Sequence, residues 1–149
     1  MRQRERLDRL RTIADIRRVQ ELAARTTAMR VVREAGECMR ERQARAAALD
    51  EAEAGWRQAV VESSPGEAMA RIWLAAILQR VGELTVADER LELATAARER
   101  AQRATEMAMA RRHIAGRAVK TAARRLQAGL EEDRGAALID CYLIRRERP

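Results

Sequence analysis

The sequence predicts an all-α fold, a long antiparallel two-helix hairpin or coiled coil with one central turn near Ser63–Glu67. Three observations lead to this prediction. Aromatic residues make up only 2% of the 149 residues and charged residues 36%, so a compact aromatic-rich core is excluded. The apolar residues are mostly Ala and Leu, which favour helix. The two prolines stand at positions 65 and 149, which leaves one point where a helix must stop.

The first helix is expected over about residues 4–62, a stretch without proline. In the first part of this stretch the larger apolar residues recur at every third position: Leu7, Leu10, Ile13, Ile16, Val19 and Leu22. Because a helix turns every 3.6 residues, a three-residue spacing drifts around its surface. This pattern predicts a broad stripe with contacts on more than one side of the first helix.

The turn is predicted from the run Ser63-Ser64-Pro65-Gly66-Glu67. Ser64 followed three residues later by Glu67 matches a capping box. Pro65 would then occupy the first helical position, where its missing N–H costs nothing. The second helix is therefore expected to begin at residue 65.

The second helix, expected over about residues 65–132, carries a heptad pattern. Positions alternately three and four apart are mostly apolar: Leu84, Ala87, Leu91, Ala94, Arg98, Ala101, Thr105, Ala108, Arg112, Ala115, Val119, Ala122, Leu126 and Gly129. Such a seam predicts packing against the first helix. Gly129 and Gly135 suggest a break before a short C-terminal helix at 136–146, within a single helical-hairpin domain of residues 1–149.

The segment from Met69 to Leu78 is apolar around nearly its whole circumference. A two-helix hairpin covers only one face of each helix, so part of this segment should stay uncovered. We expect Ile72, Leu74, Leu78 or Val81 to lie outside, and exposed apolar patches typically mark interaction sites. The competing interpretation is a local core, in which Trp56, Val60 and Val61 fold over Trp73 and Ile77.

No pattern in the sequence indicates an enzyme, a cofactor site or a metal site. His113 is the only histidine, and Cys38 and Cys141 have neither metal-ligand spacing nor, in a hairpin, disulfide reach. The longest strongly apolar run, residues 72–78, is far shorter than the roughly 20 residues that cross a bilayer. A cytoplasmic protein that acts through helical surfaces is expected, without a small-molecule substrate.

The net charge of +7 raises the possibility of nucleic-acid binding. Two features argue against a nucleic-acid-binding protein. Aromatic residues for base stacking are scarce, and acidic residues are interspersed through the helices. A self-associating structural coiled coil is the other alternative. Both alternatives stay open beside a protein-binding adaptor.

The whole chain, from MRQRERLDRL through SSPGE to LIRRERP, resembles the FliJ/YscO-type stalk proteins of flagellar and injectisome type III secretion. The resemblance implies a non-enzymatic stalk in the pore of a hexameric export ATPase, which couples the ATPase ring to the membrane export gate. It further implies a peripheral place at the cytoplasmic face of the secretion apparatus, with secretion chaperones as further partners.

The resemblance also assigns residues to each partner. The gate-binding patch of such proteins has a +4, +3, +4 spacing at the start of the second helix, which Trp73, Ile77, Arg80 and Leu84 match, although Arg80 departs from the apolar pattern. With Ile72 these residues are the expected export-gate contacts. The residues expected to meet the ATPase ring come from both ends of the chain: Arg2, Arg4, Arg6, Arg9, Leu138, Ile139, Tyr142 and Arg145.

Overall fold

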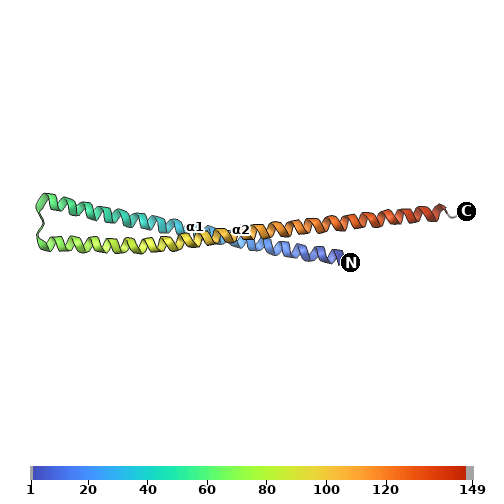
Figure 1. The fold of residues 1–149 in the computed structure, drawn as a ribbon, viewed down its shortest axis with the longest axis horizontal. Helices are drawn as coiled ribbons and strands as arrows, with labels where there is room; N and C mark the ends of the chain where they lie inside the picture. Colours follow the sequence, from blue (N-terminus) through green and yellow to red (C-terminus); the bar gives the residue numbers. More distant parts are fainter. Residues whose placement is uncertain (1, 147–149) are drawn as a thin grey trace. The chain divides into compact units, whose positions relative to one another are not determined.

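The computed structural model describes the backbone of residues 2–146 and the side chains of residues 2–139. It contains two helices, α1 (Arg2–Ser63) and α2 (Glu67–Arg146), joined by a three-residue connection (Figure 1). The described residues contain no strand. The predicted all-α helical hairpin is confirmed.

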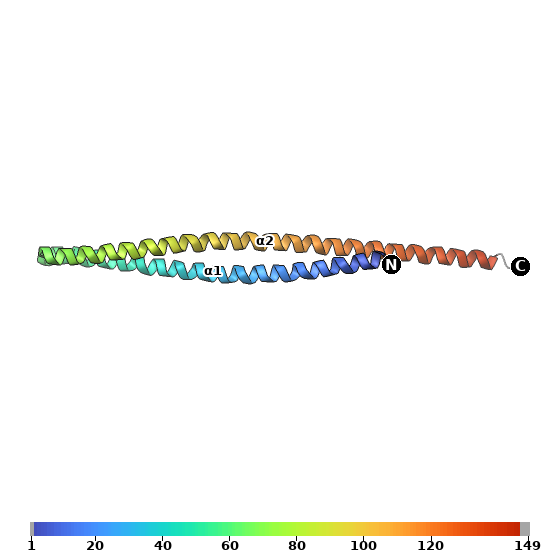
Figure 2. The same ribbon diagram turned by 90° about the horizontal axis from the view of Figure 1, so that it is seen from below.

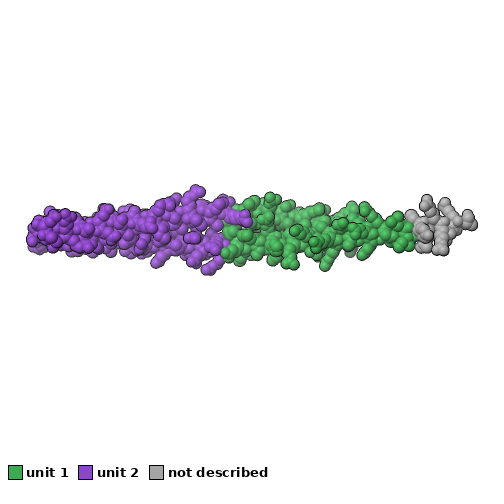
Figure 3. Space-filling model, turned by 90° about the horizontal axis from the view of Figure 1, so that it is seen from above, with its two compact units in different colours: residues 1–24, 105–149 green, residues 25–104 purple. Residues whose placement is uncertain are grey.

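The hairpin packs as two compact units, coloured separately in Figure 3. Unit 1 comprises residues 1–24 and 105–149, and unit 2 comprises residues 25–104. Each unit pairs a stretch of α1 with the antiparallel stretch of α2 beside it (Figure 2). The connection between the helices belongs to unit 2.

The packing face of α1 follows a heptad along the whole helix. A set of buried and half-buried residues alternates at spacings of three and four: Leu7, Leu10, Ala14, Arg17, Glu21, Ala24, Ala28, Val31, Ala35, Cys38, Arg42, Arg45, Leu49, Ala52, Trp56 and Ala59. Ile13, Ile16, Val19 and Leu22 are exposed and lie off this face, so contacts on other sides of α1 stay a prediction. A seam between two helices must repeat every 3.5 residues, and a three-residue spacing leaves it after one turn.

The packing face of α2 follows the predicted register. Most of the positions from Leu84 to Gly129 are buried or half-buried, while Arg98 and Arg112 keep the register but remain exposed. The same spacing continues toward the start of α2 through Arg80, Ile77, Trp73 and Ala70, which are all half-buried. The seam therefore extends to the connection.

The connection differs from the predicted capping box. α2 begins at Glu67, and the backbone N–H of Ala70 donates to the carbonyl of Gly66 at 3.1 Å. Gly66 is thus the capping residue, and Pro65 lies before the helix rather than in its first turn. Ser64 adopts a positive φ of 42°, which ends α1 as a left-handed residue commonly does. The predicted roles of Ser64 and Pro65 were wrong because this left-handed turn delays the start of α2.

Substituting Ser64 by glycine should stabilise the hairpin. A non-glycine residue with positive φ is strained, and this strain is greater before a proline. We expect Ser64→Gly to raise the free energy of unfolding by about 0.5–1 kcal/mol, after allowance for the freer unfolded chain. Urea unfolding followed by circular dichroism measures the change. Ser63→Gly is the matched control and should lower stability, because Ser63 is helical and donates its hydroxyl to the Ala59 carbonyl.

α2 does not break at Gly129 or Gly135 and runs without interruption to Arg146. Each glycine costs about 1 kcal/mol relative to alanine but, unlike proline, keeps its N–H in the helical ladder. In unit 1, Arg2 and Gln3 lie beside Gly129 and Asp133. The last turns of α2 therefore continue past the first turn of α1 (Figure 1).

Candidate functional site

A row of aliphatic side chains is exposed in unit 2, near the connection between the helices. Leu74, Leu78 and Val81 are spaced by four and three residues, so they share one face of α2. Leu74 and Leu78 are 58% and 60% exposed. We call these three residues the exposed aliphatic row. Ile72 is also exposed, at 64%, so the expectation that these four residues lie outside the local packing is confirmed.

Four of the five residues that the resemblance assigned to the export gate lie outside the exposed aliphatic row. Trp73, Ile77, Arg80 and Leu84 are half-buried on the packing face of α2, and only Ile72 is exposed. Their +4, +3, +4 spacing is the spacing of the seam itself, so it positions them toward α1. Their role in partner binding stays a prediction. The apolar surface that a partner could reach in this region is the exposed aliphatic row.

Trp73 is held in the seam by two residues of α1. Its ring centroid lies 6.5 Å from that of Trp56, with the ring planes tilted by 44°, a favourable arrangement for an aromatic pair. Gly55 makes room for the ring, because a Cβ at that position would lie 2.8 Å from Trp73 Cη2. The local core expected between residues 56–61 and Trp73 therefore forms in part through this pair.

Beyond the tryptophans, unit 2 is joined by ion pairs between the helices. Arg45 and Arg80 both contact the Glu83 carboxylate, at 2.8 Å and 3.0 Å. The hydrogen bond from Gln79, then that from Arg80 and the positive charges of Arg80 and Arg45, hold the pKa of Glu83 below its ordinary value. Two further pairs cross between the helices: Arg42–Asp88 at 2.9 Å and Arg90–Glu41 at 3.2 Å.

The lowered pKa of Glu83 predicts a pH-dependent contribution to stability. Its ordinary value is 4.5, so the stabilisation is present above that pH and is lost as the pH falls through the lower folded-state pKa. We expect the stability difference between the unsubstituted chain and Glu83→Gln to be present at neutral pH and to vanish in acid. Urea unfolding of both chains across this pH range measures it. A difference that persists unchanged in acid would contradict the assignment to the carboxylate charge.

The two units differ sharply in charge. Unit 1 contains 17 Arg and Lys residues against 10 Asp and Glu residues, whereas unit 2 contains 13 of each. The entire net charge of +7 therefore belongs to unit 1. In unit 2 basic and acidic side chains neutralise each other, so only unit 1 presents a field that attracts an anionic partner.

Unit 1 carries all the residues that the resemblance assigned to the ATPase ring. Arg2, Arg4, Arg6 and Arg9 are exposed on α1, and none of them makes an ion pair with another described residue. Leu138 and Ile139 are exposed on the last turns of α2. The side chains of Tyr142 and Arg145 lie outside the described residues. The structure thus brings the described members of this set into one unit.

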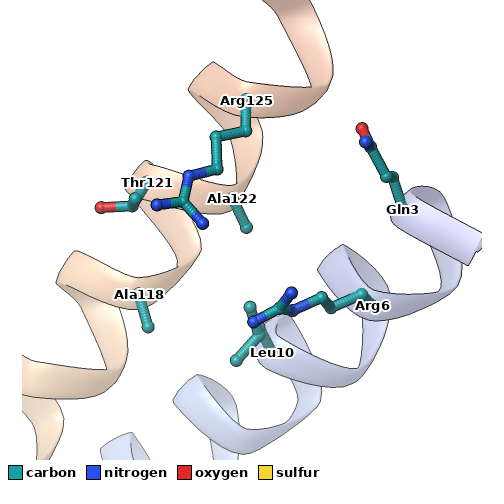
Figure 4. Close-up of a pocket in the computed structure, with 7 residues that line it drawn as sticks. All are labelled: Gln3, Arg6, Leu10, Ala118, Thr121, Ala122 and Arg125. Atoms are coloured by element: carbon teal, nitrogen blue, oxygen red, sulfur yellow. The ribbon is translucent and has the colours of Figure 1, made fainter. Parts of the chain in front are cut away.

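A hollow of about 400 Å³ lies between the helices of unit 1. Arg6 of α1 and Arg125 of α2 line it from opposite helices, with the Arg6 side chain over Leu10 and the Arg125 side chain running along its own helix (Figure 4). Sequence reasoning singled out Arg6 but missed Arg125, because only the antiparallel register brings position 125 opposite position 6. The remaining lining residues are Gln3, Ala118, Thr121 and Ala122.

An ion pair between a buried carboxylate and an exposed arginine also lies in this unit. The Glu21 carboxylate, 2% exposed, accepts a hydrogen bond from Arg112 at 2.8 Å across the seam. Thr105 donates its hydroxyl to the Ala24 carbonyl at 3.4 Å nearby. These contacts link the two helices at positions where an apolar seam would be expected.

Other features that could carry chemistry are isolated. Cys38 is a half-buried free thiol and His113 is exposed. Within the described residues no three His, Cys, Asp or Glu side chains gather as they would around a metal ion. None of the described helical stretches is apolar for long enough to cross a membrane. No family model, curated protein or solved structure matches the chain.

Proposed function

We propose that this chain is a non-enzymatic adaptor of a type III secretion export ATPase, in a flagellum or an injectisome. In this role it binds the hexameric ATPase through unit 1 and the membrane export gate through unit 2, at the cytoplasmic face of the apparatus. The observation that carries the proposal is the segregation of charge. All of the net charge of +7 lies in unit 1, and unit 2 is neutral with an exposed aliphatic row.

This segregation supports two partners of different chemistry. A cationic surface speeds and orients docking to an acidic surface, such as that of a protein ring. An exposed row at i, i+4 and i+7 suits an apolar groove or helix of a second protein. A structural coiled coil that served only as a spacer would require neither feature.

Two sets of substitutions test the proposal with the purified hexameric ATPase and the soluble domain of the export gate. Replacing Arg2, Arg4, Arg6 and Arg9 by glutamine should weaken ATPase binding at least about tenfold and leave gate binding within about twofold. Replacing Leu74 and Leu78 by serine should have the opposite selectivity. Calorimetry measures both affinities, and circular dichroism confirms that helicity is kept. Absence of binding to both partners by the unsubstituted chain would end the proposal.

Self-association is a second candidate, favoured by the same exposed aliphatic row. Two copies could cover each other's Leu74 and Leu78. A concentration series by light scattering separates the two functions. A monomer at micromolar concentration supports the adaptor, and a stable dimer that Leu78→Ser dissociates supports self-association.

The charge of unit 1 also bears on nucleic-acid binding. Neutralised phosphates would make the affinity fall steeply with salt. We expect no binding of a mixed-sequence duplex at about 0.15 M salt. Tight binding there would favour the nucleic-acid function over the adaptor.

A further inference from the structure

The hollow in unit 1 holds two arginines that no acidic residue in the described part of the chain neutralises. Neither Arg6 nor Arg125 makes an ion pair with another described residue. Neither has an acidic residue three or four positions away on its own helix, where a helical ion pair could form. The residues at those positions are Arg2, Gln3, Arg9 and Leu10 for Arg6, and Thr121, Ala122, Ala128 and Gly129 for Arg125.

The heptad register shows that this arrangement departs from the rest of the hairpin. Arg6 and Arg125 each precede a seam residue, Leu7 and Leu126, so both occupy the flanking g position. In an antiparallel pair g positions face each other across the seam. Charges of opposite sign at such positions stabilise the pairing, and charges of the same sign oppose it.

Glu41 and Arg90 provide the comparison. Glu41 lies 35 residues, or five heptads, after Arg6 on α1, and Arg90 lies 35 residues before Arg125 on α2. Glu41 and Arg90 therefore face each other in the same register positions as Arg6 and Arg125. There the guanidinium of Arg90 contacts the Glu41 carboxylate at 3.2 Å. At positions 6 and 125 both of the facing residues are arginine instead. This site therefore has a place for an anion that no described acidic residue fills.

The walls of the hollow indicate which anion it takes. Leu10, Ala118 and Ala122 provide aliphatic surface beside the guanidiniums (Figure 4). Such a site suits a carboxylate on a short aliphatic stem, and guanidinium binds carboxylate in a planar, charge-assisted geometry. A phosphodiester chain would place a ribose and bases against this surface, and the described part of unit 1 has no aromatic side chain on which a base could stack.

We propose that this hollow binds a glutamate side chain from an acidic, aliphatic segment of a partner protein. The glutamate carboxylate bridges Arg6 and Arg125, and its methylene groups pack on Leu10, Ala118 and Ala122. The inference relies on the proposed function only for the identity of the partner, the ATPase ring. The inference adds to the proposed function the group that unit 1 recognises, a glutamate carboxylate, and one further residue that recognises it, Arg125.

Peptide binding tests the inference directly. The probe is a short capped peptide with one glutamate between leucine and alanine, compared with the same peptide carrying glutamine. We expect the full chain to bind the glutamate peptide, with shifts of the Arg6 and Arg125 Nε–H signals in nuclear magnetic resonance spectra. The glutamine peptide should bind at least about tenfold more weakly, because it removes the charge from the hydrogen bonds.

Paired substitutions separate this site from the general charge of unit 1. Arg6→Gln with Arg125→Gln should weaken peptide binding by about tenfold or more. Arg18→Gln with Arg124→Gln removes the same charge, one residue from each helix, but neither residue lines the hollow. That control should change the affinity less than about twofold, which is the scale of exposed, screened charges. Equal losses in both double variants would overturn the inference, as would equal binding of an oligothymidine and the peptide.

A charge reversal provides a second, independent readout. Arg125→Glu places a carboxylate opposite Arg6, as Glu41 lies opposite Arg90. We expect this variant to abolish peptide binding while raising the melting temperature by about 1–3 °C. Retained peptide binding, or a fall in the melting temperature, would overturn the assignment of the two arginines to one anion site.

The peptide experiments and the ATPase experiments can fail separately. If the chain binds the ATPase but the glutamate peptide does not compete, the proposed function stands and this site is wrong. If the peptide binds at Arg6 and Arg125 but no ATPase binds the chain, the site stands and the partner must be another acidic protein.

Discussion

Replacing Trp73 by alanine should lower the free energy of unfolding by about 2–4 kcal/mol. Removal of a large aromatic from a full core costs about 3–5 kcal/mol, and the half-buried position of Trp73 places it below the upper limit. The loss comprises the contact with Trp56 at 6.5 Å and the space that opens beside Gly55. Urea unfolding followed by far-ultraviolet circular dichroism measures it.

Ile72→Ala is the matched control for this prediction. Ile72 precedes Trp73 in the same turn of α2 but is 64% exposed, so its truncation should cost less than about 1 kcal/mol. Similar losses for the two variants would show that Trp73 does not hold the seam. The distinction matters for function, because a Trp73 variant that fails to bind the export gate could have lost its local packing. Leu74 and Leu78 are the better probes of binding.

The second large effect is expected at the Glu21–Arg112 ion pair of unit 1. Arg112→Leu should destabilise the hairpin by about 1–3 kcal/mol, because the buried Glu21 carboxylate loses its charged partner on α2. The estimate lies below that for a fully buried pair, since the Arg112 side chain is 51% exposed. Arg111→Leu changes an exposed neighbour and should cost less than about 0.5 kcal/mol.

The joint variant, Glu21→Leu with Arg112→Leu, distinguishes stability from alignment. Two leucines in the seam should recover the loss or exceed the original stability, because well-packed apolar residues often replace an ion pair without cost. We expect the pair instead to align the helices, as a polar seam residue does in other coiled coils. Spin-label distances across the seam test this, and a single unchanged distance in the joint variant would contradict an alignment role.

Much of the fold follows from short-range properties of the chain. Proline at position 65 alone divides two proline-free stretches, and Ala, Leu, Arg and Glu favour helix in both. The seam of α2 could also be predicted, because Leu84, Leu91 and Leu126 stand among small residues at heptad spacing. Helix propensity and a regular apolar period act within a few residues, so both can be recognised before any packing is known.

The seam of α1 could not be predicted in the same way. Its packing positions include Arg17, Glu21 and Arg42, whereas the larger aliphatics Ile13 and Val19 face outward. Of the three-residue apolar pattern only Leu7 and Leu10 lie on the side that packs. The partner helix decides, because Arg42 and Glu21 become suitable seam residues only opposite Asp88 and Arg112.

The candidate sites, too, could be predicted from the sequence only in part. Charge and hydrophobicity along the chain predicted a basic N-terminal segment and an uncovered apolar segment after the turn, and both are present. The choice of Leu74 and Leu78 over Trp73 and Ile77, and the pairing of Arg6 with Arg125, depended on tertiary packing. Local sequence specifies each helix through backbone propensity, but which side chains meet across the seam depends on the register of two segments far apart in the chain, which only their joint packing sets.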